Sequence, residues 1–421
     1  MLLVAILLLI LFLMLSVPVA AALGLLGLSL DTLYSSFPLY KAAGDILWSA
    51  SNDFILVAIP LFILLGELML RSGIAERMYG AMSHWLSWLP GGLMHSNIGA
   101  SALFAATSGS SVATAATIGT VAEPQIAVHG YNKPLFLGTL AVGGTLGILI
   151  PPSINMIIYG VLTDTSIPKL YLAGIVPGLM LASLFILTVM FACMWKPSWG
   201  GVKNSSTWAQ KISSLKHLLP PLFIFAVVIF SIYLGWATAT ESAALGVVCA
   251  LIVAFLNGSF SIAMLMSALE GTMRTTSMVM LIILGAYFLN FILAGIGLTA
   301  QLTNFIAGLG LTPLETLLAI VAFYVILGFF METLTLMVTT VPIIAPIIFQ
   351  AGYDPVWFGI LLMLLIETAL ITPPIGLNLY VIQGIRKDNG SLNDVIIGSL
   401  PFVLVLFLMI ALVIIFPGIV I

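Results

Sequence analysis

Two Pro-Pro pairs, Pro151-Pro152 and Pro373-Pro374, interrupt long apolar stretches of this chain. A proline inside a helix removes a backbone hydrogen bond and clashes with the preceding turn, so each pair predicts a broken helix. The pairs lie 222 residues apart, because 373 minus 151 is 222. Other landmarks recur at that spacing: Gly130-Tyr131 returns as Gly352-Tyr353. The chain is therefore predicted to be an internal duplication.

The composition decides the class of protein. Of the 421 residues, 62% are hydrophobic and 6% are charged, whereas about a quarter of the residues in a soluble globular protein are charged. The sequence predicts an all-α polytopic membrane protein. The net charge of −3 is spread over few charged residues, and no basic segment indicates a nucleic-acid partner.

Apolar runs and breaks divide the chain into four parts. Residues 1–53 hold a first span, Leu2 to Leu30, and an interfacial segment. Residues 54–195 form the first repeat, with a hairpin at about 95–129 and a broken helix at about 134–162. Residues 196–260 form a cytoplasmic loop and a connecting helix pair. Residues 261–421 form the second repeat, with an interfacial segment near 261–274, a span at 278–294, a hairpin at about 302–349 and a broken helix at about 356–385.

The basic residues predict the orientation. If the loop from Lys196 to Lys216 is cytoplasmic, then only Lys41 and Lys169 of the 12 lysines and arginines lie outside, which leaves ten inside. The N-terminus is then cytoplasmic and the C-terminus periplasmic. An odd number of spans between equivalent points inverts the second repeat. Inverted repeats that meet at broken helices are typical of secondary transporters.

The turn-like centre of the first hairpin predicts a re-entrant segment that enters and leaves the membrane on one side. Open backbone at membrane depth survives only where protein buries it or where it lines a cavity. Freed carbonyls and hydroxyls would form an all-oxygen site suited to Na⁺. The predicted sodium ligands come from both repeats: Gly109, Ser110, Ser111, Thr114, Gly147, Pro151, Thr335, Thr339 and Pro373.

Helix N-termini at the breaks favour an anionic carboxylate. The predicted substrate-binding residues lie beside the breaks and in the first hairpin: Ser108, Ser153, Asn155, Thr372 and Asn378. The alternative for the hydroxyl residues is purely structural, since small residues let membrane helices approach closely.

Four glutamates lie in or beside apolar sequence. Glu332 and Glu367 are functional candidates, because an ionisable group is costly at membrane depth, although a structural role stays open for both. Glu67 precedes Arg71 by four residues, which predicts an ordinary helix ion pair. Glu241 is expected to stabilise a helix start.

Three other classes of function are conceivable for such a chain: an enzyme, a scaffold and a channel. An intramembrane enzyme would use Ser108 or Ser110 as a nucleophile, or Glu332 and Glu367 as an acid pair. A serine nucleophile needs a base within hydrogen-bond reach, but the only histidines near the first hairpin, His95 and His129, are expected toward its membrane-surface ends. A scaffold subunit would not need helices broken twice at matching points. An ion or anion channel stays open, because sequence does not separate a pore from alternating access.

Four motifs resemble one known family. They are the hairpin from Ser108 to Gly119, the run from Gly147 to Ser153, the segment from Ala237 to Ala244 and the run from Thr372 to Asn378. Together they look like the large membrane subunit of tripartite ATP-independent periplasmic (TRAP) transporters, over nearly the whole chain.

This resemblance implies sodium-coupled uptake of an organic acid across a bacterial inner membrane by an elevator movement. It also implies two partners, a small four-span membrane subunit and a periplasmic substrate-binding protein. Many members carry an acidic hairpin residue where this chain has Thr114, and sialic-acid-type members look more similar here. The substrate is thus expected to be sialic acid or a C4-dicarboxylate-like acid.

Overall fold

The structure is a computed structural model that describes residues 1–202 and 206–420. Within these ranges the regular elements are all helical. The α-helices are α1 (Leu2–Met14), α2 (Val19–Tyr34), α3 (Ala43–Ser51), α4 (Ala58–Arg71), α5 (Ile74–Leu86), α6 (Leu93–Ser108), α7 (Ser111–Ala122), α8 (Gln125–His129), α9 (Lys133–Leu149), α10 (Ile154–Thr163), α11 (Ile167–Trp195), α12 (Trp208–Tyr233), α13 (Ala239–Leu256), α14 (Ile262–Gly295), α15 (Leu298–Gly308), α16 (Pro313–Gly328), α17 (Thr333–Gln350), α18 (Pro355–Ile371), α19 (Leu377–Ile385) and α20 (Leu392–Ile415). Short 3₁₀ turns are η1 (Leu39–Ala42), η2 (Phe54–Val57), η3 (Pro197–Gly200) and η4 (Pro417–Ile419).

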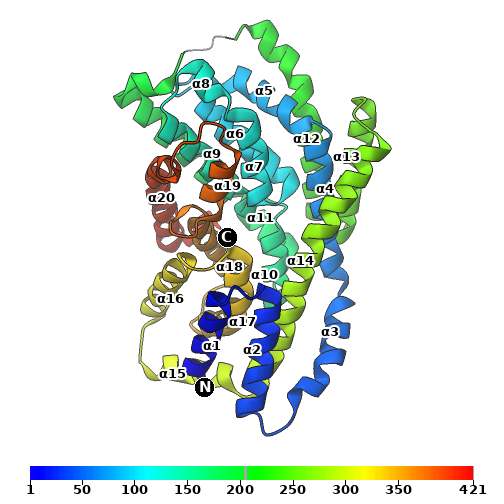
Figure 1. Cartoon of the computed structure of the whole chain (residues 1–421), viewed down its shortest axis with the longest axis vertical. Helices are drawn as coiled ribbons and strands as arrows, with labels where there is room; N and C mark the ends of the chain where they lie inside the picture. The colour runs from blue at the N-terminus through cyan, green and yellow to red at the C-terminus, as the bar shows by residue number, and fades with distance from the viewer. Residues whose placement is uncertain (203–205, 421) are drawn as a thin grey trace.

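The duplication is visible helix by helix. Adding 222 to the bounds of α9 gives the bounds of α18. In the same way α5 corresponds to α15, the α6–α7 hairpin to α16–α17, α10 to α19, and α11 to α20. In Figure 1, α5 lies near the upper end of the molecule and α15 near the lower end. The second repeat is therefore inverted relative to the first, as predicted.

Eight helical stretches in the described part of the chain are long and apolar enough to cross a membrane. The broken helix α9–α10 is the centre of the fold, because 94% of its most apolar window is buried, against 33% for α11. α9 packs against both arms of the first hairpin and against α18, α19 and α20 of the second repeat. The all-α membrane fold predicted from composition is confirmed, and both Pro-Pro pairs lie in breaks between two helices.

Several segments differ from the expected ones for local reasons. The first apolar run is two helices, because α1 ends before Ser16, which has a φ of 55°, and Pro18 then starts α2. Asp31, expected at the surface, is buried and accepts hydrogen bonds from the backbone N–H groups of Leu39 and Tyr40. The segment expected in two parts at 261–274 and 278–294 is the single helix α14. Residues 275–277, which separate the two expected parts, contain no proline or glycine that would break the helix.

The hydrophilic loop is shorter than expected. Thr207 and Gln210 form a capping box that starts α12 at Trp208, so Lys211 and Lys216 lie on a helix. Residues 203–205 of this loop lie outside the described residues. The second hairpin also begins later than residue 302, since Thr312 and Glu315 form a capping box at the start of α16.

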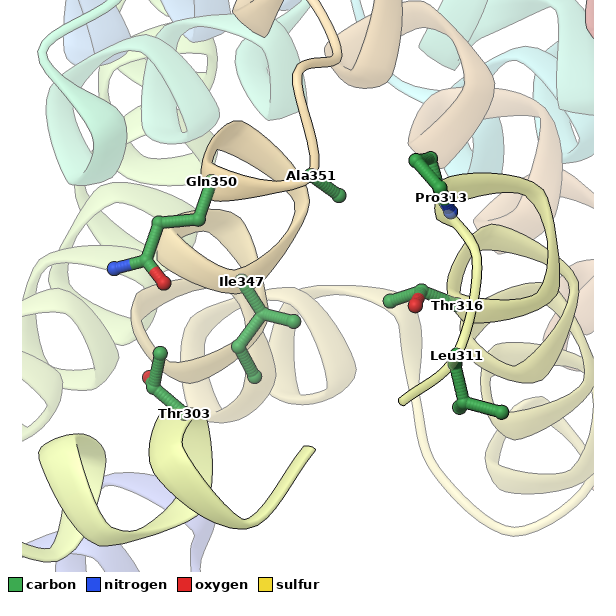
Figure 2. Close-up of a pocket in the computed structure, with 7 residues that line it drawn as sticks. All are labelled: Thr303, Leu311, Pro313, Thr316, Ile347, Gln350 and Ala351. Carbon is green, nitrogen blue, oxygen red and sulfur yellow. The ribbon is translucent and has the colours of Figure 1, made fainter. Parts of the chain in front are cut away.

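A cavity of about 190 Å³ lies where α15, α16 and α17 meet (Figure 2). Its lining includes Thr303 on α15, Pro313 and Thr316 at the start of α16, and Gln350 at the end of α17. These positions are at the opposite end of the second hairpin from its tip between α16 and α17. The cavity is therefore separate from the predicted site.

Candidate functional site

The tip of the first hairpin is a tight turn. Gly109 adopts a φ of 59° after α6, and the Ser110 hydroxyl then accepts from the N–H of Ala113 at 3.4 Å to cap α7. Thr114 donates its hydroxyl to the carbonyl oxygen of Ser110 at 2.7 Å. The hydroxyl oxygens of Ser108 and Thr114 are 3.1 Å apart. Four predicted site residues therefore share one hydrogen-bonded turn.

This turn lies directly against the first break. A Cβ atom on Gly109 would lie 2.7 Å from the carbonyl oxygen of Pro152, and the N–H of Ile154 faces the carbonyl oxygen of Gly109 at 3.5 Å. Gly147, at the end of α9, approaches the backbone of Ser110 and Ser111 equally closely. The structure thus brings together the hairpin and the break that the sequence paired.

Asn378 joins the same place from the second repeat. It lies in the first turn of α19, is 0% exposed, and donates from Nδ2 to the carbonyl oxygen of Ala141 in α9 at 3.0 Å. Gly144 makes this approach possible, since a Cβ there would lie 2.8 Å from Asn378 Nδ2 and 3.0 Å from the carbonyl oxygen of Ser111. Elements of both repeats therefore converge on the first hairpin.

Three buried oxygen atoms in this region have no hydrogen-bond partner among the described residues: Ser111 Oγ, Ser153 Oγ and Asn378 Oδ1. Leaving such a group unpaired costs about 1 to 3 kcal/mol. Neutral hydroxyl and amide oxygens, together with helix-end carbonyls, match the ligand preference of a hard cation such as Na⁺. These residues therefore fit a bound ion or polar ligand.

The second hairpin is capped differently. Glu332 occupies the position equivalent to Ser110, since 332 minus 222 is 110, and its carboxylate accepts from the N–H of Thr335 at 3.1 Å. The hydroxyls of Thr333 and Thr335 also donate to it. Thr339 donates back to the carbonyl oxygen of Thr335 at 2.7 Å. Thr335 and Thr339 are both buried, and Thr335 contacts a carboxylate that the first hairpin lacks.

The two breaks differ in exposure. Pro151, Pro152 and Ser153 are buried, whereas Thr372 and Pro373 are half-buried and Pro374 is exposed. The second arms of the hairpins are arranged alike: α7 packs against α9 and α19, and α17 packs against α18 and α10. Each hairpin therefore contacts the half-helix after the other repeat's break, but only the first break is enclosed.

A polar chain that the sequence did not suggest supports the first hairpin. Tyr79 on α5 donates to Asn97 Oδ1 at 2.8 Å, and Asn97 Nδ2 donates to Thr139 Oγ1 on α9 at 2.9 Å. All three residues are buried. Asn155, in the first turn of α10, is also buried. These residues lie on three separate helices, so no regular spacing in the sequence links them. Only the tertiary structure shows that they are hydrogen-bonded to one another.

The remaining glutamates are placed as follows. Glu67 pairs with Arg71 at 2.8 Å, as predicted. Glu241 belongs to a capping box with Thr238 at the start of α13, which confirms its structural role. Glu367 is fully buried in α18. Within the described residues, no group of three His, Cys, Asp or Glu side chains could hold a metal ion.

Residues 6–419 match the family model of the tripartite ATP-independent periplasmic transporter, DctM component. The chain belongs to this family. It is 33% identical to the C4-dicarboxylate TRAP transporter large permease protein DctM of Pseudomonas aeruginosa, covering 89% of this chain and 87% of the relative. It is 32% identical to the sialic acid TRAP transporter large permease protein SiaM of Vibrio cholerae, covering 95% and 93%.

The fold is also similar to the crystal structure of the Alcanivorax borkumensis YdaH transporter. The TM-score is 0.62 over 98% of both chains, at 16% sequence identity, so this likeness concerns the fold alone. The chain is thus a TRAP transporter large membrane subunit and a multi-pass membrane protein. Its relatives are transporter permeases, so the enzyme alternative built on Ser108, Ser110, Glu332 and Glu367 is not retained.

Proposed function

We propose that this DctM-family chain carries out sodium-coupled uptake of an organic carboxylate, of the C4-dicarboxylate or sialic acid class. The observation that carries the proposal is the set of unpartnered buried oxygens, Ser111 Oγ, Ser153 Oγ and Asn378 Oδ1, beside a hairpin and a broken helix. The substrate class is taken from the two relatives, whose names include C4-dicarboxylate and sialic acid.

Sodium is the co-substrate that suits these residues. The oxygens are neutral, and the carbonyls of Ser110 and Pro152 lie at the same turn. The further ligands proposed for the first repeat are Gly109, Thr114, Gly147 and Pro151, and those for the second are Thr335, Thr339 and Pro373. A transition metal would prefer His, Cys or carboxylate clusters, which the described residues do not offer.

The substrate carboxylate is proposed to lie between the hairpins. The N-termini of α10 and α19 follow the two breaks, and helix N-termini attract anions. Ser153 and Asn155 begin α10, while Thr372 and Asn378 flank the break before α19. Together with Ser108, these residues are the proposed substrate contacts, and Ser153 and Asn378 would also offer their unpartnered oxygens to sodium, because ion and substrate share this place.

The motion proposed is an elevator-type alternation, with both hairpins re-entrant. The difference in exposure between the two breaks supports this motion. In alternating access, a transporter with two inverted repeats would have the break of one repeat closed and the break of the other repeat open in any one state. The second candidate, a channel, would not require this difference.

The assembly proposed includes a small four-span membrane subunit and a periplasmic substrate-binding protein, in a bacterial inner membrane. The C-terminus would be periplasmic. In Figure 1, α3 and the N-terminus both lie toward the lower end of the molecule, opposite α5 and α8. If α3 is periplasmic, as the charges predict, the N-terminus would also be periplasmic and not cytoplasmic as expected from the sequence, since the first apolar run is two helices and not one span.

The test is accumulation in proteoliposomes that contain the complete transporter. An inward sodium gradient should drive labelled substrate above its external concentration, and potassium should not replace sodium. A channel would only equilibrate the substrate, so uptake that never exceeds equilibrium would reject the proposal.

A further inference from the structure

Glu367 is an acid that the proposed sodium and substrate sites do not use. It lies in α18 and is 0% exposed, and neither carboxyl oxygen has a hydrogen-bond partner among the described residues. The neighbouring hydroxyls are committed elsewhere: Thr368 donates to the carbonyl oxygen of Leu365, and Thr372 donates to that of Thr368. The side chain is therefore enclosed without local polar support.

The helices around α18 do not supply a charge to balance it. α18 packs against α9, α10, α11, α16, α17, α19 and α20. Their titratable side chains in the described structure are Lys133, Tyr159, Lys169, Tyr171, Cys193, Glu315, Tyr324, Tyr380 and Asp394. None of these has a hydrogen bond or ion pair with Glu367.

Most of those side chains have other partners. Tyr159 donates to the carbonyl oxygen of Pro355, and Tyr171 donates to that of Ser153. Tyr324 accepts from Thr340. Lys133 and Asp394 belong to an ionic cluster at the start of α9 and the start of α20. An ionised Glu367 would thus stand unpaired at membrane depth, which is strongly unfavourable.

The equivalent position in the first repeat shows that the fold does not need an acid here. Since 367 minus 222 is 145, the counterpart is Thr145 on α9, which is also fully buried. Its hydroxyl donates to the carbonyl oxygen of Val142 at 2.8 Å, so it supplies its own partner. The acid is therefore a departure from the repeat and calls for a functional reason.

We propose that Glu367 is a proton site of the transport cycle, separate from the sodium site. A sodium ion needs several oxygen ligands, and within the described part of the chain no group forms a hydrogen bond with this carboxyl. A proton needs none. When Glu367 is open to water on one side of the membrane, its carboxylate takes a proton from water and becomes a neutral acid. It keeps this proton in the enclosed conformation, and when it opens to water on the other side, the proton returns to water. The inference rests on the proposed transport function for its cycle.

Infrared difference spectroscopy on the purified protein tests the protonation itself. At neutral pH the wild type should show the C=O stretching band of a neutral carboxylic acid, and this band should be lost in Glu367→Gln. Glu367→Asp should keep a shifted band, and the exposed Glu270→Gln should leave it unchanged. A wild type without the band, or a band that persists in Glu367→Gln, overturns the proposal whether or not uptake is sodium-coupled.

A pH-sensitive dye in proteoliposomes tests the cycle, at fixed sodium. Wild-type uptake should move protons with the substrate, and Glu367→Gln should lose that movement. If the wild type moves no protons during uptake, the cycle role is rejected. Uptake without sodium dependence would reject the proposed function instead, and the infrared band would still decide the proton site if Glu367→Gln did not transport.

Discussion

The side-chain amide of Asn378 donates a hydrogen bond of 3.0 Å to the backbone carbonyl oxygen of Ala141. The two residues are 237 positions apart and belong to different repeats. The bond fixes the half-helix after the second break to the helix before the first break. The Oδ1 atom of the same amide is buried and has no hydrogen-bond partner among the described residues. The two repeats thus share one site beside the first hairpin.

The contact of Gly144 with Asn378 predicts a sensitive position. In Gly144→Ala, the new Cβ would lie 2.6 Å from the Cβ of Ala115 and 2.8 Å from Asn378 Nδ2, so α7 and α19 must move. Overpacking of this kind costs about 1 to 3 kcal/mol. Thermal unfolding in detergent should show the loss, and uptake should fall with it.

Gly384→Ala on the same helix as Asn378 is the control. No atom lies within 4 Å of the added Cβ, so stability should stay equal or rise by up to about 1 kcal/mol. Equal thermal stability of the two variants would show that the close approach at Gly144 does not contribute to stability.

The equivalence of Glu332 and Ser110 predicts how the second hairpin tip responds to substitution. Glu332→Ser should keep α17 capped, whereas Glu332→Ala should lose about 1 kcal/mol because the N–H of Thr335 loses its acceptor. Ser110→Ala is the matched change in the first hairpin and should lose a similar amount. If Glu332→Ser unfolds as readily as Glu332→Ala, capping is not what the carboxylate contributes.

The sequence predicted most of what depends on local pattern. The Pro-Pro pairs, the repeat spacing and the apolar runs gave both broken helices, the hairpins and their inversion, because these depend on helix-breaking residues and on length. Some local features were missed, among them the turn at Ser16 that divides the first apolar run and the continuity of α14, where Thr275, Thr276 and Ser277 look like a boundary yet stay helical.

Contacts between distant residues were beyond the reach of the sequence. Asn378 was expected to face a ligand, and nothing in its neighbourhood indicated that Ala141 would take its amide. The hydrogen bonds from Tyr79 to Asn97 and from Asn97 to Thr139 likewise join three helices. Such contacts are fixed by how helices pack, and a single sequence records only which residues are able to make them.

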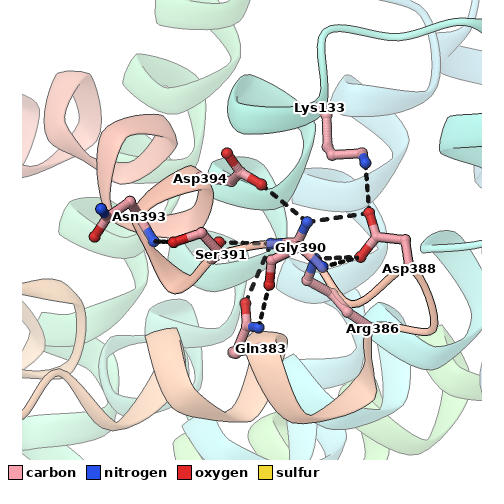
Figure 3. Close-up of polar contacts among 8 residues, drawn as sticks. All are labelled: Lys133, Gln383, Arg386, Asp388, Gly390, Ser391, Asn393 and Asp394. Atoms are coloured by element: carbon pink, nitrogen blue, oxygen red, sulfur yellow. Dashed lines mark hydrogen bonds and ion pairs between the residues drawn. The ribbon is translucent and has the colours of Figure 1, made fainter.

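An ionic cluster fastens the α19–α20 loop to α9 (Figure 3). Asp388 accepts from Arg386 and pairs with Lys133, and the buried Arg386 also binds Asp394. Arg386 first, and then Lys133, hold the pKa of Asp388 well below its ordinary value. Asp388→Asn should therefore cost about 1 to 3 kcal/mol at neutral pH.

The sign of the pH dependence follows from the lowered pKa. The stabilisation is complete above the unfolded-state pKa of about 3.9 and is lost as the pH falls through the lower folded-state pKa. The difference in free energy of unfolding between wild type and Asp388→Asn should thus be constant from pH 7 to about pH 5 and should decrease only in stronger acid. Glu270→Gln, in a fully exposed pair with Arg274, should change little at any pH. A stability difference that already disappears near pH 6 would contradict the lowered pKa of Asp388.

The proposed orientation is tested by cysteine labelling of whole cells, in a background where Cys193 and Cys249 are replaced by alanine. Ser36→Cys, exposed between α2 and η1, should react with an impermeant reagent added outside. Ser198→Cys, exposed in η3, should react only after the membrane is permeabilised. The reverse pattern would invert the topology.

The central claim is that sodium binds beside the first hairpin with Asn378 as a ligand, and the sodium activation curve of uptake tests it most directly. Wild-type uptake by the reconstituted complete transporter should vanish without sodium. Asn378→Leu should raise the half-saturating sodium concentration by about tenfold or more, equivalent to about 1.4 kcal/mol, whereas Asn378→Asp keeps an oxygen ligand and should stay sodium-dependent. The exposed Asn393→Leu should match the wild type. Undiminished wild-type uptake in sodium-free buffer, or an unchanged sodium curve in Asn378→Leu, would contradict the account.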